Sequence, residues 1–310
     1  MRVRAAVIGC GGIAGRYDEE KTAAGCYTHA GAYRLHPEVE LVAAADPDPA
    51  RRAAFGRRWG VRHVYADARD LLAQHPVEIV SVCVPDALHE EVIGQVLAAR
   101  PPKVIFAEKP LALGRHGARK LLDEAAALGV RIVLNNQRRW EAGHRQVRDL
   151  IRAGTIGQVV TVTAFYVKGL YHIGCTAIDT IRFLVGEVET VQALGGEHRA
   201  SIPGDPSVDA ALYLGNGATA AMLGVDRYGY RYSLFELDIL ATEGRVRLVG
   251  NGDRILVSRV RPYAHYPGFG ELHEAPDRAI PAPLCAGGVA LPIRCSAYGL
   301  AAGQRASMRT

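Results

Sequence analysis

The chain has 310 residues, of which 49% are hydrophobic and 22% charged, a globular composition long enough for two domains with separate cores. It contains no run of eighteen apolar residues, which argues against a membrane-spanning helix. Its net charge of +5 is spread over isolated arginines, whereas a nucleic-acid surface needs clustered basic residues. We therefore expect a protein that binds neither membranes nor nucleic acids.

The cysteines and the N-terminus restrict the class of protein further. Six cysteines are scattered along the chain without a C-x-x-C pair, a spacing that predicts no metal site and reduced thiols. The first ten residues, MRVRAAVIGC, lead directly into glycines and lack the apolar segment of a signal peptide. A cytoplasmic location is expected.

A glycine-rich motif follows the first predicted strand, residues 3–8. Residues 9–14, GCGGIA, have the form G-x-G-x-x-A of a dinucleotide-binding turn. The first glycine permits a tight turn, the second lets a pyrophosphate approach the backbone, and the small last residue lets the next helix pack on the strand. Phosphates would accept hydrogen bonds from N–H groups at the helix N-terminus. Cofactor contacts are predicted at Gly9, Gly11, Gly12, Ile13 and Ala14.

The second predicted strand, residues 39–46, ends at Asp46. An acid about 20 residues beyond the glycine motif accepts hydrogen bonds from the adenosine ribose of NAD, and it repels the 2′-phosphate of NADP. Asp46 follows Ala14 by 32 positions, but residues 17–28 are polar and aperiodic and are interpreted as a twelve-residue insertion. Without that insertion the spacing is as expected, so NAD is favoured over NADP.

Predicted helices and strands then alternate through the first half of the chain. Helices are expected at 48–59, 87–99 and 114–128, and strands at 63–67, 78–85, 103–108 and 131–136. This alternation predicts an α/β Rossmann domain with a doubly wound parallel sheet over residues 1–135. Ligands of such sheets bind at the carboxyl ends of the strands. The residues predicted at those ends include Pro85, Glu108, Lys109 and Asn135.

The second half of the chain contains strand-like runs separated by turn residues, between residues 158 and 260. A helix is expected to begin near residue 174. On it, Thr176 and Asp179 share a polar face, whereas Ile181 can face a core. Residues 261–283 show no strand pattern and are expected to form a long irregular loop.

Together these motifs resemble the Gfo/Idh/MocA family of dehydrogenases, which includes glucose–fructose oxidoreductase and inositol dehydrogenase. The matching segments are THAGAY (28–33), VPDALH (84–89), EKP (108–110), NNQRRW (135–140), AGTIGQV (153–159) and IDTIRFLVGEV (178–188). The resemblance implies a nicotinamide-dependent oxidoreductase that acts on sugars, cyclitols or similar polyols. It also implies an α+β second domain, residues 136–310, with an open, mostly antiparallel sheet that assembles a homodimer or homotetramer. Residues 295–307 resemble the closing helix of the family in compressed form.

The resemblance also implies roles for individual residues. Lys109 of the E-K-P motif would lie near the nicotinamide and move the substrate proton, and His89 would lie near the nicotinamide ribose. Pro85 and Glu108 are placed among the cofactor-binding residues, and the Glu108 carboxylate is expected to turn away from Lys109. Substrate contacts are expected from Lys109, Arg138, Tyr166, His172 and Thr176.

The catalytic segment of the family, H-x-G-[ST]-H-x-x-D in one subgroup, is altered here. In YHIGCTAID, residues 171–179, His172 and Asp179 match the pattern, but Thr176 replaces the second histidine. Threonine cannot exchange a proton at neutral pH, whereas histidine can. The second proton-handling role is therefore assigned to His172, assisted by Asp179, although a histidine satisfied in packing is an alternative.

Two other functions stay open at this point. Some relatives keep NAD bound and cleave a glycosidic bond through transient oxidation, so an NAD-dependent glycoside hydrolase-like enzyme is one alternative. The threonine in place of the family histidine suggests the other, a catalytically degenerate NAD-binding protein.

Overall fold

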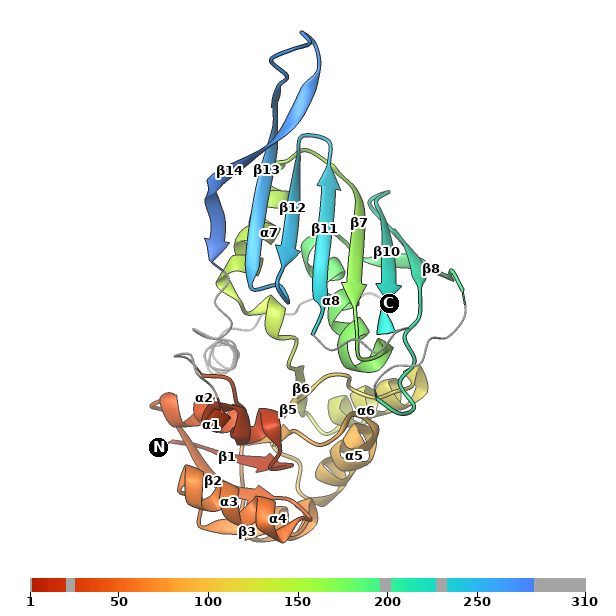
Figure 1. Cartoon of the computed structure of the whole chain (residues 1–310). Helices are drawn as coiled ribbons and strands as arrows, with labels where there is room; N and C mark the ends of the chain where they lie inside the picture. Colours follow the sequence, from red (N-terminus) through yellow and green to blue (C-terminus); the bar gives the residue numbers. More distant parts are fainter. Residues whose placement is uncertain (1, 21–25, 196–201, 227–232, 282–310) are drawn as a thin grey trace. The chain divides into compact units, whose positions relative to one another are not determined.

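The computed structural model describes residues 2–20, 26–195, 202–226 and 233–281 (Figure 1). They divide into two compact units, of which the first extends through Trp140 and the second begins at Glu141.

In the described residues, the first unit is built on a six-stranded sheet with the order β3-β2-β1-β4-β5-β6. Every strand runs parallel to its neighbours. This order, in which the chain reverses direction across the sheet between β1 and β4, is that of a dinucleotide-binding Rossmann fold, so the predicted doubly wound parallel sheet is confirmed. The strands are β1 (Val3–Ile8), β2 (Val39–Ala45), β3 (His63–Tyr65), β4 (Ile79–Val82), β5 (Val104–Ala107) and β6 (Arg131–Leu134).

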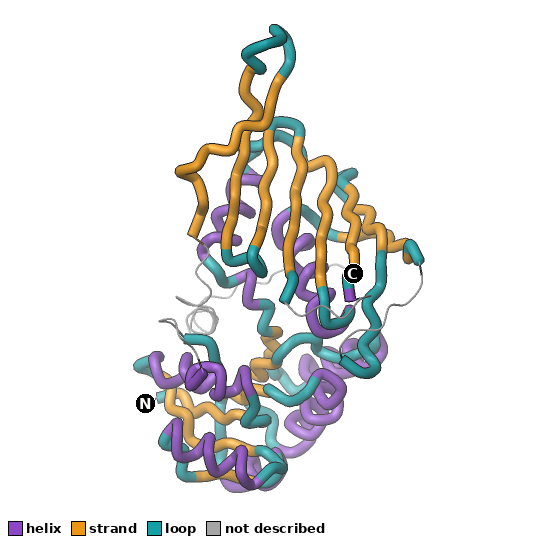
Figure 2. Tube along the Cα trace, viewed as in Figure 1, coloured by secondary structure: helices purple, strands orange, loops and turns teal. Residues whose placement is uncertain are grey.

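Helices pack on both faces of this sheet (Figure 2). Ala5 and Val7 of β1 belong to the core beneath α2 and α3, whereas Ala6 and Ile8 belong to the core beneath α4, α5 and α6. Because both faces are covered, the strand is apolar at every position from Ala5 onward. The helices are α1 (Tyr17–Glu20), α2 (His29–Leu35), α3 (Pro49–Trp59), α4 (Ala68–Gln74), α5 (His89–Ala99) and α6 (Arg115–Ala127), with short turns η1 (Gly12–Arg16), η2 (Asp86–Leu88) and η3 (Gln137–Arg139).

The predicted insertion, residues 17–28, is partly helical rather than irregular throughout. The π turn η1 continues directly into α1. The buried Asp18 then accepts hydrogen bonds from the Thr28 hydroxyl (2.5 Å) and from the Tyr27 amide (3.0 Å). Thr28 in turn caps α2 by accepting from the Gly31 amide (3.1 Å). One carboxylate therefore closes the base of the insertion.

The second unit contains an eight-stranded sheet in its described residues, with the order β14-β13-β12-β11-β7-β10-β9-β8. All neighbours are antiparallel except β7 and β10, which confirms the predicted mostly antiparallel sheet. The elements are α7 (Ala142–Arg152), β7 (Val159–Tyr166), η4 (Leu170–Gly174), α8 (Cys175–Leu184), β8 (Val188–Ala193), β9 (Ala210–Leu214), β10 (Thr219–Gly224), β11 (Phe235–Ala241), β12 (Gly244–Val249), β13 (Arg254–Pro262) and β14 (Gly270–Pro281).

The core of this unit lies between one face of the sheet and the helices α7 and α8. Leu237 pairs with Leu248 and Ile239 with Val246, and all four side chains are buried. Ile181 of α8 packs into the same cluster, as the sequence pattern predicted. Apolar residues thus alternate with residues that face away from the helices.

The predicted long loop at residues 261–283 is wrong for its described part. Residues 254–262 and 270–281 form the hairpin β13–β14, in which Val260 lies opposite Leu272 (Figure 1). A strand was predicted up to residue 260, and proline and glycine interrupt the alternation that would have predicted the end of β13 and β14. The segment compared with the family's closing helix, 295–307, lies outside the described residues.

No helix in the described part of the chain is long and apolar enough to cross a membrane. The same residues contain no group of three or more His, Cys, Asp or Glu side chains that could hold a metal ion.

Candidate active site

The glycine turn after β1 has the geometry that a dinucleotide requires. Gly9 has a φ of +87°, and a Cβ there would lie 2.7 Å from the carbonyl oxygen of Cys83, so only glycine fits. A Cβ on Gly11 would meet no heavy atom of the described residues within 4 Å. This backbone segment therefore borders open space, where a pyrophosphate could approach.

The first helical residues after the turn pack closely on their surroundings. Ala14 is fully buried, as expected for the small last residue of the motif. Ile13 packs at the edge of the same core. The Tyr17 ring lies against Gly12, where an added Cβ would come within 2.4 Å of it. Sequence reasoning missed Tyr17 as a residue beside the glycine turn.

Asp46 lies at the carboxyl end of β2 and is bonded to the glycine turn. Its Oδ2 accepts from the Cys10 amide and its Oδ1 from the Asp48 amide, each at 2.8 Å. A carboxylate has about four lone-pair sites, so both oxygens retain capacity for a ribose hydroxyl. Arg52 donates to the backbone carbonyl of Asp46 at 3.2 Å. The acid is therefore buried and fixed beside the turn, and its contact with a ribose stays a prediction.

The thiol of Cys10 is not a reactive group. Burial, reinforced by the charge of Asp46, raises the pKa of Cys10 to about 12. Burial likewise raises the pKa of Cys83 well above its ordinary value. Both side chains are protonated at neutral pH and pack as small apolar groups.

The residues predicted at the strand ends lie along one edge of the sheet in the first unit. Gly9, Asp46, Pro85, Glu108 and Asn135 follow β1, β2, β4, β5 and β6, and the strands are parallel, so these positions share one edge of the sheet. Lys109, which is partly exposed, and Arg138, on η3, lie in the loops of the same edge.

Glu108 is buried and has hydrogen-bonding partners inside the first unit. Its Oε1 lies 3.0 Å from His29 Nε2 and accepts a hydrogen bond of 2.6 Å from Asn135 Nδ2. Burial opposes its ionisation, but the hydrogen bonds from His29 and Asn135, together with the charge of Lys109, hold the pKa of Glu108 below its usual range. The carboxylate is thus ionised and hydrogen-bonded inside the unit, and its contact with the cofactor stays a prediction.

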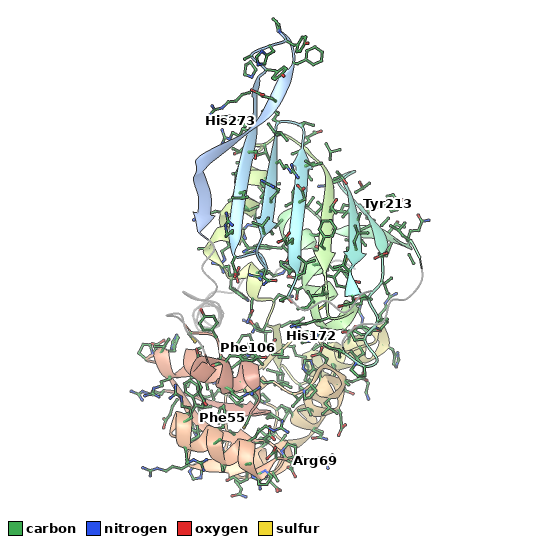
Figure 3. The ribbon with its side chains drawn as sticks, viewed as in Figure 1. Phe55, Arg69, Phe106, His172, Tyr213 and His273 are labelled. Atoms are coloured by element: carbon green, nitrogen blue, oxygen red, sulfur yellow. The ribbon has the colours of Figure 1, made fainter. Side chains whose placement is uncertain are left out.

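Two hydroxyl groups, those of Ser81 and Tyr33, extend this cluster. His29 Nδ1 lies 2.8 Å from Ser81 Oγ, which lies 2.6 Å from the Tyr33 hydroxyl. The His29 ring packs on Phe106, with centroids 4.6 Å apart (Figure 3 labels Phe106). Ser81, His29 and Glu108 are in contact in the same succession as the serine, histidine and acid of a hydrolase triad. Ser81 is 0% exposed, however, so no substrate reaches its hydroxyl.

His89 is buried rather than open to a ribose. Its Nδ1 lies 2.5 Å from the carbonyl oxygen of Pro110, and its Nε2 lies 2.9 Å from that of Val84. It therefore joins the loop after β4 to the E-K-P loop. Both partners are carbonyl acceptors, so a neutral imidazole donates to one of them. The structure shows His89 between these loops, and its contact with a ribose stays a prediction.

In the second unit, His172 lies in the π turn η4, which leads directly into α8 (Figure 3). Asp205 holds this turn, because its two oxygens accept from the amides of Tyr171 and His172, each at 2.8 Å. Gly169 has a φ of +85°, and a Cβ there would come within 2.5 Å of all the atoms of the Asp205 carboxyl group. Sequence reasoning missed Asp205, because a Gly-Asp-Pro turn gives no sign of a partner 33 residues away.

The other predicted residues of this unit separate into two groups. Thr176 and Asp179 lie on α8 and are partly exposed. Tyr166 is fully buried, and its hydroxyl donates to Val208 O (2.7 Å) and accepts from Val208 N (2.8 Å). Both hydrogen-bonding roles of that hydroxyl are taken by backbone, so Tyr166 is placed as a core residue and not as a substrate contact.

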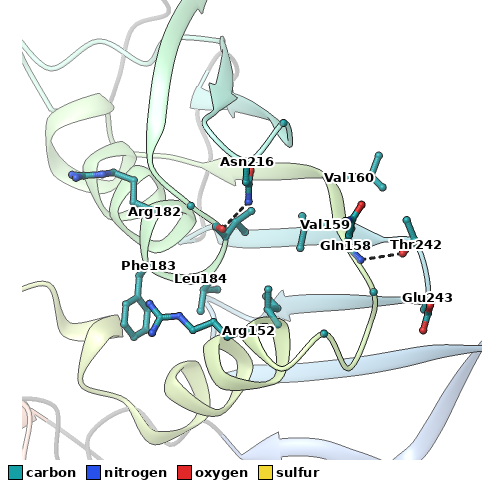
Figure 4. Close-up of a pocket in the computed structure, with 16 residues that line it drawn as sticks. Arg152, Gln158, Val159, Val160, Arg182, Phe183, Leu184, Asn216, Thr242 and Glu243 are labelled. Carbon is teal, nitrogen blue, oxygen red and sulfur yellow. Dashed lines mark hydrogen bonds between the residues drawn. The ribbon is translucent and has the colours of Figure 1, made fainter.

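The second unit also has an open pocket of about 910 Å³, between the ends of α7 and α8 and the turns of the sheet (Figure 4). Its walls include Arg152, Phe183, Asn216 and Glu243. The side-chain amide of Asn216 donates a hydrogen bond to the carbonyl oxygen of Val185 (3.0 Å). The site residues predicted from the sequence are not among those that line it.

Comparison with known proteins shows which proteins the chain is similar to. The family profile described as "Oxidoreductase family, NAD-binding Rossmann fold" (GFO_IDH_MocA) matches residues 3–136. Inositol 2-dehydrogenase from Ralstonia nicotianae is 32% identical over 207 residues, which cover 65% of this chain and 57% of that protein. The first unit of the chain therefore matches the NAD-binding Rossmann fold of the Gfo/Idh/MocA oxidoreductase family.

One further relative and two solved structures are similar over more of the chain. Inositol 2-dehydrogenase 3 from Saccharopolyspora erythraea is 28% identical, over 80% of this chain and 73% of that protein. A 3-ketoreductase from Actinomadura kijaniata, crystallised with NADP, has the same fold, with a TM-score of 0.75, 23% identity and coverage of 97% of this chain and 90% of that one. Levoglucosan dehydrogenase in complex with NADH has a TM-score of 0.72 at 20% identity, over 95% and 88% of the two chains.

The chain spans little more than half the length of several curated relatives that it matches. For inositol 2-dehydrogenase from Rubrobacter xylanophilus, 28% identical, the aligned region is 63% of this chain and 56% of that protein.

Proposed function

We propose that this protein is an NAD-dependent oxidoreductase that transfers a hydride between nicotinamide and a hydroxyl-bearing carbon of a sugar-like or cyclitol-like substrate. The observation that carries the proposal is the common sheet edge that bears the glycine turn, Asp46 and Lys109. Relatives named as inositol 2-dehydrogenase and D-glucoside 3-dehydrogenase support the substrate class. Residues 1–135 would hold the cofactor and residues 136–310 the substrate.

The residues present fit a dinucleotide. Gly9 and Gly11 leave the turn open to a pyrophosphate, and the carboxylate of Asp46 is held beside it. When bound, NAD supplies the carbon that accepts or donates the hydride. The chain's own groups bind and orient the reactants and move the proton of the substrate hydroxyl.

In the proposal, Lys109 moves that proton. Oxidation of an alcohol carbon releases one proton from its hydroxyl as the hydride leaves, and an amine at hydrogen-bond distance can accept it. His172, with Asp179, is the second proton-handling group, and Arg138 and Thr176 contribute substrate contacts. Tyr166 is left out, because its hydroxyl is bonded to Val208.

Asp46 is expected to make NAD bind more tightly than NADP. Its carboxylate would accept from the ribose hydroxyls and repel a 2′-phosphate. Calorimetric titration of both cofactors, with the wild type and Asp46→Ser, measures this preference. The substitution should weaken NAD binding and reduce the difference between the affinities for NAD and NADP. Equal affinities in the wild type would remove Asp46 from the cofactor site.

His172, not Thr176, is expected to carry the second protonic role. His172→Gln should lower kcat by about 10² and change the pH–rate profile, because an imidazole can donate or accept a proton at neutral pH and an amide cannot. Thr176→Val, one helical turn away, serves as the matched control and should cost much less. If His172→Gln leaves both rate and profile unchanged, His172 has only a packing role.

A panel of cyclitols, sugars and glycosides tests the proposed reaction class. A dehydrogenase converts NAD into NADH in step with the loss of substrate. A hydrolase-like relative would cleave a glycoside without net NADH, and a degenerate protein would bind NAD without consuming any compound. Net NADH formation, measured by absorbance with product analysis, separates these three functions.

Assembly and location belong to the same proposal. A homodimer or homotetramer in the cytoplasm is proposed, and the sheet of the second unit supports assembly, since its face turned from α7 and α8 exposes Tyr213 and Leu240. Light scattering coupled to gel filtration measures the mass in solution.

A further inference from the structure

A buried hydrogen-bonded chain ends next to Lys109. It links Tyr33, Ser81, His29 and Glu108 through contacts of 2.6, 2.8 and 3.0 Å. Tyr33 is 1% exposed, Ser81 and His29 are 0% exposed, and Glu108 is 8% exposed. Because water does not reach these groups, breaking one of these hydrogen bonds leaves a buried donor or acceptor without a partner, which costs free energy.

One arrangement of protons satisfies every link. An ionised Glu108 can only accept, so His29 Nε2 carries a proton and donates to it. His29 Nδ1 then accepts from the Ser81 hydroxyl, whose oxygen accepts from Tyr33. Burial raises the pKa of Tyr33, so this phenol keeps its proton and remains a donor. The chain is complete with a neutral His29, and it fixes the position of the Glu108 carboxylate.

A second buried histidine holds the other side of the same loop. His89 lies against the carbonyl of Pro110, the residue after Lys109, and against Val84 (2.5 and 2.9 Å). The residues on both sides of Lys109 are therefore held from helices α2 and α5. The peptide that carries the lysine cannot shift without breaking a buried hydrogen bond.

We propose that His29 and Glu108 are positioning residues for Lys109. His29, which lies 79 positions earlier in the chain than Glu108, holds the Glu108 carboxylate and thereby fixes the backbone from which Lys109 projects. The expected effect on kcat rests on the proposed function. The expected effect on the position of Lys109 does not depend on it.

Two substitutions of His29 separate positioning from packing. Glutamine can place its amide nitrogen where Nε2 lies and keep the donor to Glu108, whereas asparagine reaches only the position of Nδ1 and loses that donor. His29→Asn should lower kcat about tenfold or more with NAD affinity unchanged, since a small displacement of a reacting group is costly. His29→Gln should retain most of the activity. His36→Asn, at the other end of α2, is the matched control.

The position of Lys109 is also measured without turnover. Limited acetylation followed by peptide mass spectrometry gives the labelling rate of each lysine, and Lys103 and Lys120, both exposed, serve as internal references. Lys109 should be labelled several-fold faster in His29→Asn than in the wild type or His29→Gln, while the references stay constant.

The outcomes are distinguishable. Unchanged labelling and kcat in His29→Asn, or equal losses in both variants that follow a lower melting temperature, would overturn the positioning role. A changed labelling rate in a protein that reduces no NAD with any substrate would leave that role supported and contradict the proposed function.

Discussion

Lys109→Met is expected to abolish turnover while leaving NAD affinity within about a few-fold. The lysine lies at the carboxyl end of β5, on the sheet edge shared with the glycine turn, and is proposed to act on the substrate proton. Loss of a general acid–base group typically costs about 10² to 10⁴ in rate. Methionine preserves the length and apolar stem of the side chain and removes only the amine.

Lys103→Met is the matched control for this experiment. Lys103 lies at the opposite end of the same strand, is exposed, and has its Nζ 3.9 Å from Glu78. Its replacement should leave kcat unchanged, because an exposed ion pair contributes little. A Lys109→Met variant that keeps most of its kcat would place the chemistry on another residue.

Gly11→Ala should fold normally and lose cofactor affinity. The new Cβ would meet no atom of the described residues within 4 Å, and the φ of −82° suits alanine. It would occupy space that the pyrophosphate needs. Loss of one hydrogen bond to a charged group costs about 1.5–3 kcal/mol, so affinity should fall roughly ten- to a hundredfold.

Two other glycines provide controls for this result. Gly94→Ala, on α5, also adds a Cβ that contacts no described residue and should leave both melting temperature and NAD affinity unaffected or slightly improved. Gly9→Ala should lower the melting temperature itself, because of its positive φ and the nearby Cys83 carbonyl. If calorimetry finds wild-type NAD affinity in Gly11→Ala, the turn does not hold a pyrophosphate.

The first unit could be predicted from sequence because its signals are local. The glycine motif, the acid at the end of β2 and the apolar strands between amphipathic helices each lie within a short segment. In the second unit, the alternation of apolar and polar residues predicted the strands that have one buried and one more exposed face, such as β11 and β12. It failed at β14, where proline and glycine interrupt the pattern.

The contacts that organise the candidate site could not be predicted in this way. His29 lies within the matching segment THAGAY, but nothing local shows that its ring reaches Ser81 and Glu108, 52 and 79 positions away. Glu108 and His89 were expected to contact the cofactor because of where they lie in their motifs. In the structure both are buried and have hydrogen-bonding partners inside the first unit, as Asp46 also has, and their contact with the cofactor stays a prediction.

The most direct measurement follows the hydride itself. Each polyol of the panel is deuterated at the carbons that bear hydroxyl groups and incubated with the protein and NAD. The mass of the recovered nicotinamide cofactor is then measured by mass spectrometry. The account predicts reduced nicotinamide one mass unit heavier for at least one polyol with the wild type and Lys103→Met, and none with Lys109→Met. A protein that binds NAD but transfers deuterium from no member of the panel would contradict it.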